Sequence, residues 1–591
     1  MKKILYFIVV LISLPAFSQL YVGNTYAIYA KNEVVFVNQN IELQSGANFY
    51  LRNEAQLLQG SVSTSTNKGL GQFSVFQEGN SNNFAFNYWC APVGNASATI
   101  GNENFGITML GSPVNATTTT PAIMLSGGPD GIASPLSISD NWIYTYLSSA
   151  TFSGWNDIGS ATTIAPGQGF TMKGTGGTDT TVVENNAVQN NSGSAQRYDF
   201  RGKPNDGNIA VNVAPASFTL TGNPYPSALN MNAFLLDAGN TACTGIAYYW
   251  EQDKTVNSHY LADYKGGYGT YSPINLGSSG IYVPAIFNTF NPNGTVNNAG
   301  ISSGLTAIER KYAPIGQGFI IEGAIVGSQV TLKNTHRSYY KESTTANSYF
   351  SRNSNSQDSS ATPVNDSLLS FIRFNINIDN QFTRQLALVF ASEATDSIDH
   401  GIEAEYSDAF PNDTYFLIED GKYVIQGVAF DAAKKISIGL NATANTTFSF
   451  SIAEAVNFDL QQPVYVHDKF DDSFHDIRTE NYVINPEEGN YSDRYEITFV
   501  NTPLALPETT ISGITIYQDN DKKTLTIDNK LQQDLDSAVL FDISGKQIYV
   551  WDNMGTNAEY FHSTSGLSAG IYLIKISMSG NKFFTQKIAI K

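Results

Sequence analysis

Short segments in which apolar and polar residues alternate recur along almost the whole chain. Residues 371–378 and 571–576 are typical, because they are rich in β-branched and aromatic residues and are bounded by Asn, Gly, Asp or Ser. Alternation with a period of two is the pattern of a half-buried strand. The sequence therefore predicts an all-β fold of tandem β-sandwich domains, jelly-roll or immunoglobulin-like. One exception is residues 230–239, where a leading Asn and a closing Gly predict a short helix.

Two stretches of the chain carry the same features in the same order. Each has a Pro-containing first segment, an aromatic segment with Trp in or beside it, a stretch rich in Gly and Tyr, and a Gly-Gln-Gly-Phe segment that begins at Gly167 or Gly316. Four features in one order indicate an internal repeat. The only polar side chain that the two Gly-Gln-Gly-Phe segments share is Gln168 or Gln317. We therefore expect two closing strands of duplicated sandwiches rather than a catalytic loop used twice.

These segments and two linkers define the predicted organisation of the chain. Residues 351–367 are rich in Ser and Asn and have little apolar surface to bury, and residues 501–512 precede a change in charge, so both are predicted linkers. The predicted parts are a signal peptide (1–18), a β-rich cap that resembles a short β-solenoid (19–72), a first sandwich repeat (73–200), a second repeat (201–350), a third sandwich domain (368–500) and a C-terminal domain (513–591).

The N-terminus has the features of a secretory signal peptide. Met1 and two lysines precede an apolar run that ends at Phe17, and small residues stand at Ala16 and Ser18. An apolar run of this length is too short to span a bilayer comfortably, so we predict cleavage after Ser18. No later segment approaches the roughly 20 apolar residues of a membrane helix, so no transmembrane segment is predicted after cleavage.

The charge of the chain excludes one class of partner. Charged residues make up 14% of the chain, and the net charge is −19. Affinity for nucleic acid comes mainly from clustered Lys and Arg, so no nucleic-acid partner is predicted. A composition rich in Tyr and Phe and poor in charge instead favours an uncharged-polar and aromatic surface.

The two cysteines, Cys90 and Cys243, allow two interpretations. In an exported protein a disulfide between them would close a long loop and could stabilise the fold by up to about 4 to 5 kcal/mol. Both residues also lie in apolar sequence, where a small buried thiol is common. The sequence leaves both interpretations open.

The motifs that suggest an enzyme fail in their context. Residues 566–570 read Gly-Leu-Ser-Ala-Gly, but a nucleophile elbow at Ser568 needs a helix after it, and a strand-like run follows. Residues 506–510 resemble a sortase signal without the Gly, apolar span and basic tail that such a signal needs. We therefore expect a non-enzymatic protein, although carboxylates that meet only in the folded chain stay open.

One hairpin-like segment offers metal ligands. His467 and Asp468 are separated by a short Asp- and Ser-containing turn from His475 and Asp476, so the two imidazoles could meet across a hairpin and hold a transition metal. A surface hairpin explains the same residues without a metal. No motif predicts another cofactor, and the sequence leaves structural calcium open.

An aromatic stretch is the better candidate for binding. Trp250, Tyr260, Tyr264, Tyr268 and Tyr271 alternate with Asp, Asn, His and Gly across residues 248–273. Such residues could form a stacking surface for sugar rings. They could equally fill the core of a sandwich, because aromatic residues are common in strands.

The C-terminal 80 or so residues resemble the type A sorting domain of proteins exported by the type IX secretion system. The resemblance rests on residues 539–548, on residues 567–576 and on the terminal Lys-Ile-Ala-Ile-Lys, although residues 517–520 replace the Tyr-Pro-Asn-Pro turn that usually opens the domain. The motif residues are Gly545, Leu567, Gly570, Tyr572, Lys587 and Lys591. The resemblance implies an antiparallel sandwich that serves as an export signal.

The same resemblance implies a route and partners. The expected route is export to the periplasm, recognition by an outer-membrane translocon, cleavage by a sorting protease near residues 507–513, and release or attachment to surface lipopolysaccharide. We therefore expect a secreted or cell-surface protein of a Gram-negative bacterium with a structural or adhesin-like role. The alternative is a carbohydrate-binding or carbohydrate-active surface protein that uses the aromatic stretch to bind extracellular glycans.

Overall fold

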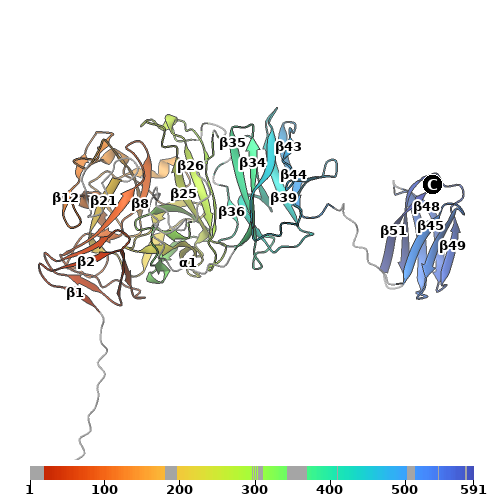
Figure 1. Cartoon of the computed structure of the whole chain (residues 1–591), viewed down its shortest axis with the longest axis horizontal. Helices are drawn as coiled ribbons and strands as arrows, with labels where there is room; N and C mark the ends of the chain where they lie inside the picture. The colour runs from red at the N-terminus through yellow and green to blue at the C-terminus, as the bar shows by residue number, and fades with distance from the viewer. Residues whose placement is uncertain are drawn as a thin grey trace, which may run out of the picture. The chain divides into compact units, whose positions relative to one another are not determined.

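A computed structural model describes residues 19–179, 196–342, 369–501 and 513–591, apart from 296, 298–299, 301, 304–309, 407, 409, 543–544 and 579–581. These residues form mainly β-strands, so the predicted all-β class is confirmed (Figure 1). Residues 1–500 and 501–591 belong to two compact units. The predicted signal peptide, the 351–367 linker and all but Asn501 of the 501–512 linker lie outside the described residues.

The N-terminal strands stack in parallel. Leu20 of β1 lies opposite Ile41 of β4, and Ala27 of β2 lies opposite Asn48 of β5. The strands are β1 (Leu20–Val22), β2 (Ala27–Lys31), β3 (Val34–Val37), β4 (Ile41–Leu43), β5 (Asn48–Arg52), β6 (Gln56–Gln59) and β7 (Gln72–Gly79). Strand β7 joins these N-terminal strands to the first module, because β5 pairs with it on one side and β21 (Gln196–Pro204) on the other. The first, second and third modules are the parts at residues 73–200, 201–350 and 368–500.

Two antiparallel strand pairs of the same construction, each made of strands far apart in the sequence, occur in the first unit. Strand β8 (Phe86–Cys90) pairs with β19 (Gly169–Lys173), and β23 (Phe218–Gly222) pairs with β31 (Gly318–Gly323). In each strand pair the second glycine of Gly-Gln-Gly-Phe lies opposite the last residue of the first strand. The first glycine has a positive φ in both copies, 79° at Gly167 and 78° at Gly316, so both copies turn into the closing strand through a left-handed residue.

The β8–β19 pair also contacts the β23–β31 pair. Cys90 N donates a 2.8 Å hydrogen bond to the carbonyl of Gly316, and Thr221 Oγ1 donates a 2.7 Å bond to the carbonyl of Gly167. A Cβ atom on Gly318 would lie 2.6 Å from the carbonyl carbon of Tyr88, which is closer than side-chain carbons approach backbone. Glycine at this position therefore lets β31 lie directly on β8.

In the second module the β23–β31 pair is part of a five-stranded sheet. The order is β23-β31-β25-β26-β27, with β25 (Cys243–Gln252), β26 (Gly266–Ser272) and β27 (Ile281–Val283). The predicted helix is present as α1 (Met231–Leu235), and the Asn230 side chain accepts a 3.2 Å bond from Ala233 N as the expected cap. It ends before Gly239, at Leu236.

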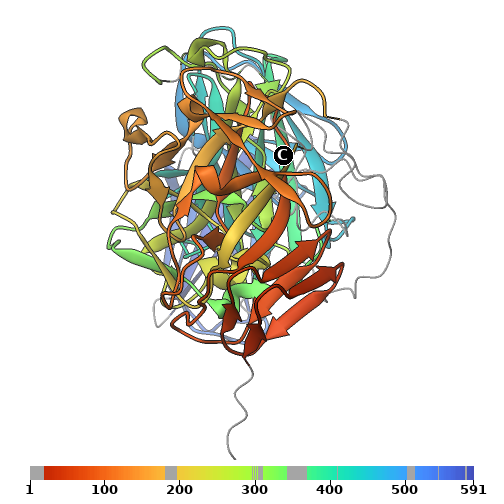
Figure 2. The ribbon, with the colours of Figure 1, turned by 90° about the vertical axis from the view of Figure 1, so that its left-hand side faces the viewer.

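The third module is one continuous ladder, in the order β42-β41-β44-β39-β37-β38-β35-β34-β40-β43. Its strands are β34 (Ser370–Ile378), β35 (Phe382–Phe390), β37 (Asp413–Ile418), β38 (Gly421–Val428), β39 (Lys435–Ala442), β40 (Phe448–Val456), β41 (Tyr465–Asp468), β42 (Ser473–Asp476), β43 (Tyr482–Ile484) and β44 (Gly489–Thr498). Apolar residues of these strands share one core with Leu220, Tyr248 and Ile281 of the second module. The modules of residues 19–500 therefore pack as one body, in which the second and third modules lie side by side (Figure 1). Figure 2 views the ribbon from the side of the N-terminal strands.

The C-terminal unit is a small antiparallel sandwich. One sheet contains β45 (Ile514–Asp519), β46 (Thr524–Asn529) and β49 (Glu559–Ser563). The other contains β47 (Leu535–Asp542), β48 (Gln547–Gly555), β50 (Gly570–Met578) and β51 (Lys582–Ile590). Leu525, Leu540 and Ile574 are fully buried between them, so this unit has its own core.

The disulfide interpretation of the two cysteines is wrong. Cys90 and Cys243 are both free and fully buried. Cys90 lies beside Gly222, where the β8–β19 pair contacts the β23–β31 pair, and Cys243 Sγ donates to the carbonyl of Asn240 at 3.3 Å. Burial raises the pKa of both thiols, that of Cys243 to about 11, so neither is a reactive thiolate at neutral pH.

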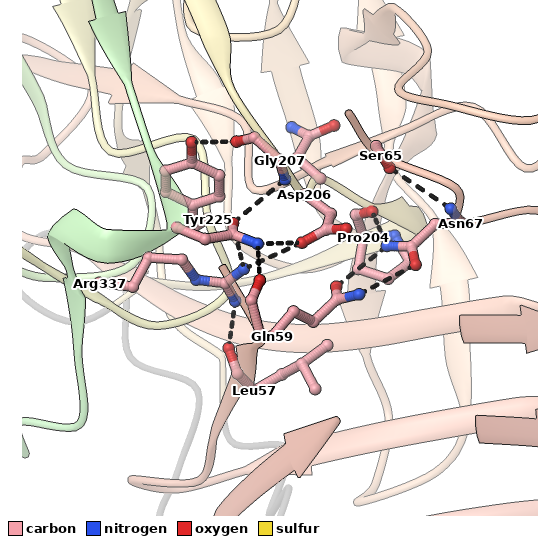
Figure 3. A network of polar contacts seen from close by, with 12 residues as sticks. Leu57, Gln59, Ser65, Asn67, Pro204, Asp206, Gly207, Tyr225 and Arg337 are labelled. Carbon is pink, nitrogen blue, oxygen red and sulfur yellow. Dashed lines mark hydrogen bonds and ion pairs between the residues drawn. The ribbon is translucent and has the colours of Figure 1, made fainter. Parts of the chain in front are cut away.

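A buried polar network connects the N-terminal strands to the second module (Figure 3). Arg337 donates to the carbonyl of Leu57 and lies 3.6 Å from Asp206, and both charged side chains are fully buried. Asn334 Nδ2 donates a 2.7 Å bond to Asp206 Oδ1, and Tyr225 donates a 2.6 Å bond to the carbonyl of Gly207. Burial lowers the pKa of Arg337 to about 10, so the guanidinium remains charged at neutral pH.

We expect Arg337→Met to lower the free energy of unfolding by about 3 to 5 kcal/mol, because it leaves Asp206 buried without its cation. Urea unfolding followed by tryptophan fluorescence measures this change. The double variant Arg337→Met/Asp206→Asn should recover part of the loss. Lys434→Met is the control, because its partner Asp396 is largely exposed and such pairs contribute about 1 kcal/mol or less. A loss in Arg337→Met no larger than the control would show that the network is not stabilising.

Candidate functional site

A pocket of about 470 Å³ lies between the first and second modules. Its walls come from the paired strands β8 and β19 of the first module, from β25 and β26 of the second module, and from β16 (Tyr144–Tyr146) and β17 (Trp155–Asp157). The lining is strongly aromatic. Its aromatic members are Phe86, Tyr88, Trp142, Tyr144, Tyr146, Phe152, Trp155, Phe218, Tyr248, Trp250, His259, Tyr264, Tyr268 and Phe290.

Strand alternation explains which side chains reach this pocket. Phe86 and Tyr88 of β8 face it, whereas the intervening Asn87 does not line it and the following Trp89 is fully buried in the core of the first module. On the other wall, Trp250 of β25 and Tyr268 of β26 lie directly opposite one another in the antiparallel pair. Cross-strand pairs of this kind present two rings on one face of a sheet.

The rings form flat and upright walls around Tyr88. The Tyr88 ring is parallel to that of Trp250 within 4°, at a centroid distance of 6.3 Å, and the Trp155 ring stands at 68° to it, at 5.8 Å. The Tyr88 and Tyr268 hydroxyls are 2.8 Å apart. Burial raises the pKa of both tyrosines, so both hydroxyls are protonated at neutral pH and one donates its hydrogen to the other.

The structure brings together three of the five aromatic residues proposed from the sequence. Trp250, Tyr264 and Tyr268 line the pocket. Tyr271 does not, because three positions along a strand reverse the face, and its hydroxyl donates to Asn232 in the core of the second module. Tyr260 is 78% exposed and does not line the pocket, so these two residues are removed from the candidate site.

Sequence reasoning missed the half of the pocket that the first module supplies. Tyr88, Tyr146 and Trp155 come from segments that the sequence analysis treated as strands of a separate sandwich. The aromatic segments at residues 87–94 and 141–147 were the available signal. These segments face β25 and β26 only because the β8–β19 pair contacts the β23–β31 pair, and no local sequence pattern indicates that contact.

A buried lysine supports one edge of the pocket. Lys173 of β19 is 4% exposed, and its Nζ lies 3.7 Å from the centroid of the Trp142 ring and donates to the Tyr264 hydroxyl. The same Nζ is 3.0 Å from His259 Nδ1, and His259 Nε2 is 2.8 Å from Asp130 Oδ1. Burial lowers the pKa of Lys173 to about 7, against the opposing attraction of Asp130. This amine can therefore change its protonation state at the pocket edge near neutral pH.

The proposed metal ligands do not converge. Strands β41 and β42 form the predicted hairpin, but His467 lies opposite Phe474, and His475 lies opposite Val466, so the imidazoles are on opposite faces. His467 contacts Glu496 and Asp472 at 2.7 and 3.0 Å, and Asp468 pairs with Arg494 at 2.7 Å. Asp476 Oδ1 caps the turn at Arg478 N. Within the described ranges, no three His, Cys, Asp or Glu side chains gather to hold a metal ion.

Ser568 lies in a turn between β49 and β50, and no helix follows it. The strand β50 thus stands where a nucleophile elbow would need a helix. Residues 506–510, which resemble a sortase signal, lie outside the described residues.

The residues of the C-terminal motif build turns and strand ends. Gly545 has a φ of 82° in the turn between β47 and β48, and Gly570 begins β50. The Tyr572 hydroxyl donates to the carbonyl of Ser568 at 3.0 Å, and Leu567 packs on the sandwich core. Lys587 is exposed on β51, and Lys591 N donates to Asn520 at 2.9 Å. These residues shape the end of the sandwich.

Sequence comparison with protein families gives two matches. The profile of a family described as a domain of unknown function (DUF8693) matches residues 16–499, which is most of the chain. The chain belongs to this family. A secretion system C-terminal sorting domain matches residues 519–591, so the resemblance found in the sequence is confirmed.

The sorting domain establishes the destination of the chain. A protein of this family with such a domain is exported through the type IX secretion system of a Gram-negative bacterium to the cell surface or the medium. Its C-terminal unit engages the secretion machinery. None of the helices in the described part of the chain has the length and apolar character of a membrane span.

Other comparisons add little. No curated protein matches the chain in sequence. PorZ of Porphyromonas gingivalis, a surface component of the type IX secretion system, is 12% identical over 29% of this chain and 24% of its own, with a TM-score of 0.12. A polysaccharide lyase is 11% identical over 38% of this chain and 40% of its own, also at 0.12. The chain thus spans less than half of either structure.

The pKa of Lys173 predicts a pH-dependent difference between the wild type and Lys173→Met. Below about pH 7 the amine is protonated in both the folded and unfolded states, so the wild type bears the full cost of the buried charge. As pH rises from 7 toward 10.5, the folded state loses the proton first, and that cost disappears. The wild type should gain on the order of 4 kcal/mol relative to the variant over this range.

Urea unfolding of both proteins at pH 7 and pH 10 measures this difference. Lys434→Met, which removes a lysine from a surface pair, controls for a change in charge. A difference between wild type and Lys173→Met that stays constant with pH would contradict the assignment.

Proposed function

We propose that this exported protein is a non-enzymatic, adhesin-like surface protein whose aromatic pocket binds sugar rings of an extracellular glycan. The observation that carries the proposal is the juxtaposition of Tyr88, Trp155, Trp250 and Tyr268 around a pocket of about 470 Å³. Pockets that bind small ligands commonly have volumes of about 300 to 1,000 Å³. The proposal combines the adhesin-like role with the glycan-binding alternative predicted from the sequence.

The chemistry of the walls supports a sugar ligand. A pyranose ring has apolar C–H faces and polar hydroxyl edges. Parallel and upright rings such as those of Trp250 and Trp155 offer stacking surfaces to the faces. The hydroxyls of Tyr88 and Tyr268 share one hydrogen bond with each other, and their oxygens keep lone pairs that can accept from the hydroxyl edges.

The composition of the site supports binding rather than catalysis. Glycoside hydrolysis generally needs two carboxyl groups that flank the scissile bond. Among the described residues, the pocket lining contains no Asp or Glu. The free thiols are buried with raised pKa values, and Ser568 lacks the elbow geometry. We therefore propose that the ligand leaves the pocket unchanged.

The final steps of export complete the proposal. Cleavage by a sorting protease between residues 507 and 513 would separate the C-terminal sandwich from residues 19–500. The large unit would then be released or attached to surface lipopolysaccharide, with its pocket intact. The support for this step is that the C-terminal sandwich has a core of its own, so its removal breaks no shared core.

We expect Trp250→Ala to weaken glycan binding about five- to thirtyfold, because it removes a stacking surface that contributes on the order of 1 to 2 kcal/mol. A glycan array identifies a ligand, and isothermal titration calorimetry then measures its affinity. Tyr260→Ala is the matched control, because this exposed aromatic residue lies outside the pocket. Binding that is unchanged in Trp250→Ala, or no binding to any glycan, would refute the proposed site. Release of reducing sugar would overturn the non-enzymatic assignment.

Deletion of residues 513–591 should strand residues 19–500 in the periplasm, because the translocon would no longer find its export signal. Fractionation and surface labelling of cells that express this truncation measure the location. The truncated chain should remain folded, because the two units have separate cores. Surface display of the truncation would refute the role of the C-terminal sandwich.

A further inference from the structure

A second, smaller cavity of about 70 Å³ lies against the aromatic pocket. The two share Phe86, Tyr88 and Trp250 in their linings, so the parallel Tyr88 and Trp250 rings border both. Its chemistry differs from that of the pocket. Polar side chains dominate its lining, and its volume suits a carboxylate group or a few water molecules, not a sugar ring.

Three buried donors in the lining have no partner among the described residues. These are Asn87 Nδ2, Tyr249 Oη and Gln252 Nε2. The three side chains are at least nine-tenths buried. The oxygens of Asn87 and Gln252 are already engaged, because Asn87 Oδ1 accepts from Asn80 N, and Gln252 Oε1 accepts from Phe86 N and Trp250 Nε1. Buried donors without partners are costly, so a ligand that satisfies them must supply acceptors.

The charges around the cavity favour an anionic acceptor. Lys254 and Arg310 line it together with one carboxylate, Glu251. Glu251 Oε1 accepts a hydrogen bond from the buried Tyr282 hydroxyl. The Arg310 guanidinium lies 4.5 Å from the centroid of the Tyr249 ring, which places a cation beside one of the unsatisfied donors. Two cations and one anion give the lining a net positive charge in an acidic protein.

We propose that this cavity receives a carboxylate of the glycan, so that the protein selects acidic glycans that contain uronate residues. The proposal rests on the proposed function, because the ring that carries the carboxylate lies against Trp250 in the aromatic pocket. The two carboxylate oxygens provide acceptors for Asn87, Gln252 and Tyr249, and the cations offset the charge. Charge-assisted bonds of this kind are the stronger class of hydrogen bond.

The test compares acidic oligosaccharides with neutral ones of the same linkage. The probes are oligosaccharides of galacturonate, mannuronate and glucuronate, each with its carboxyl-reduced neutral counterpart, titrated calorimetrically into the exported protein. At least one acidic probe should bind at least about tenfold more tightly than its neutral counterpart. Asn87→Asp, which keeps the accepting Oδ1 and replaces the donor by an anionic oxygen, should abolish this preference and leave the binding of the neutral probe unchanged.

A gentler pair of variants guards against a folding defect. Tyr249→Phe removes only the hydroxyl from the cavity and should weaken the acidic probe several-fold. Tyr495→Phe is the matched control, because the Tyr495 hydroxyl is also buried without a partner among the described residues but lies on β44 of the third module and does not line the cavity. It should leave both affinities unchanged.

The outcomes separate this inference from the proposed function. Equal binding of acidic and neutral probes, or an equal loss of both in Asn87→Asp, would overturn the carboxylate site and leave the glycan site standing. No binding of any probe or array glycan would overturn both. A preference for acidic probes that survives Asn87→Asp and Tyr249→Phe would also overturn the carboxylate site, because the charge would then be recognised elsewhere.

Discussion

Gly318 comes closer to the backbone of Tyr88 and Trp89 than any larger residue could, and the two halves of the aromatic pocket depend on this contact. It holds β31 against β8, and β31 in turn pairs with β25. Tyr88 of the first module thereby faces Trp250 of the second. The Gly-Gln-Gly-Phe segments thus act through their backbones, since their glycines permit the left-handed turn and the close approach. The binding side chains come from the neighbouring strands.

The features that the sequence predicted well are those that local physics determines. Alternating apolar and polar residues produced strands such as β34 and β50, and Asn230 capped α1 as expected. The hairpin around residues 469–472 was also foreseen, because its turn residues and flanking apolar positions lie close together in the chain. Within one strand pair the consequences of a two-residue period are rigid. Tyr268 and Tyr271 therefore had to face opposite sides, a consequence that the list of candidate residues overlooked.

The candidate site was only half predictable, because its other half depends on contacts between distant segments. The alternation of β19 places Lys173 on the face opposite Phe170 and Met172, and in an isolated strand pair this face would be exposed. The second module covers that side with Tyr264 and His259, and the lysine becomes a buried support of the pocket. The cysteines show the same limit. Nothing in their spacing indicates that Cys90 lies where the two strand pairs meet, or that Cys243 contacts the carbonyl of Asn240.

The polar network around Arg337 also constrains how the chain can fold. Its contact with Leu57 joins residues 280 positions apart, and several neighbouring bonds to residues 334–342 span similar separations. A high contact order of this kind slows folding, because the loop must close before the contact contributes. The N-terminal strands cannot complete their polar bonds until more than half of the chain has emerged. The first part of the chain to reach the periplasm therefore waits, with its edges unfinished, for a partner segment that arrives much later.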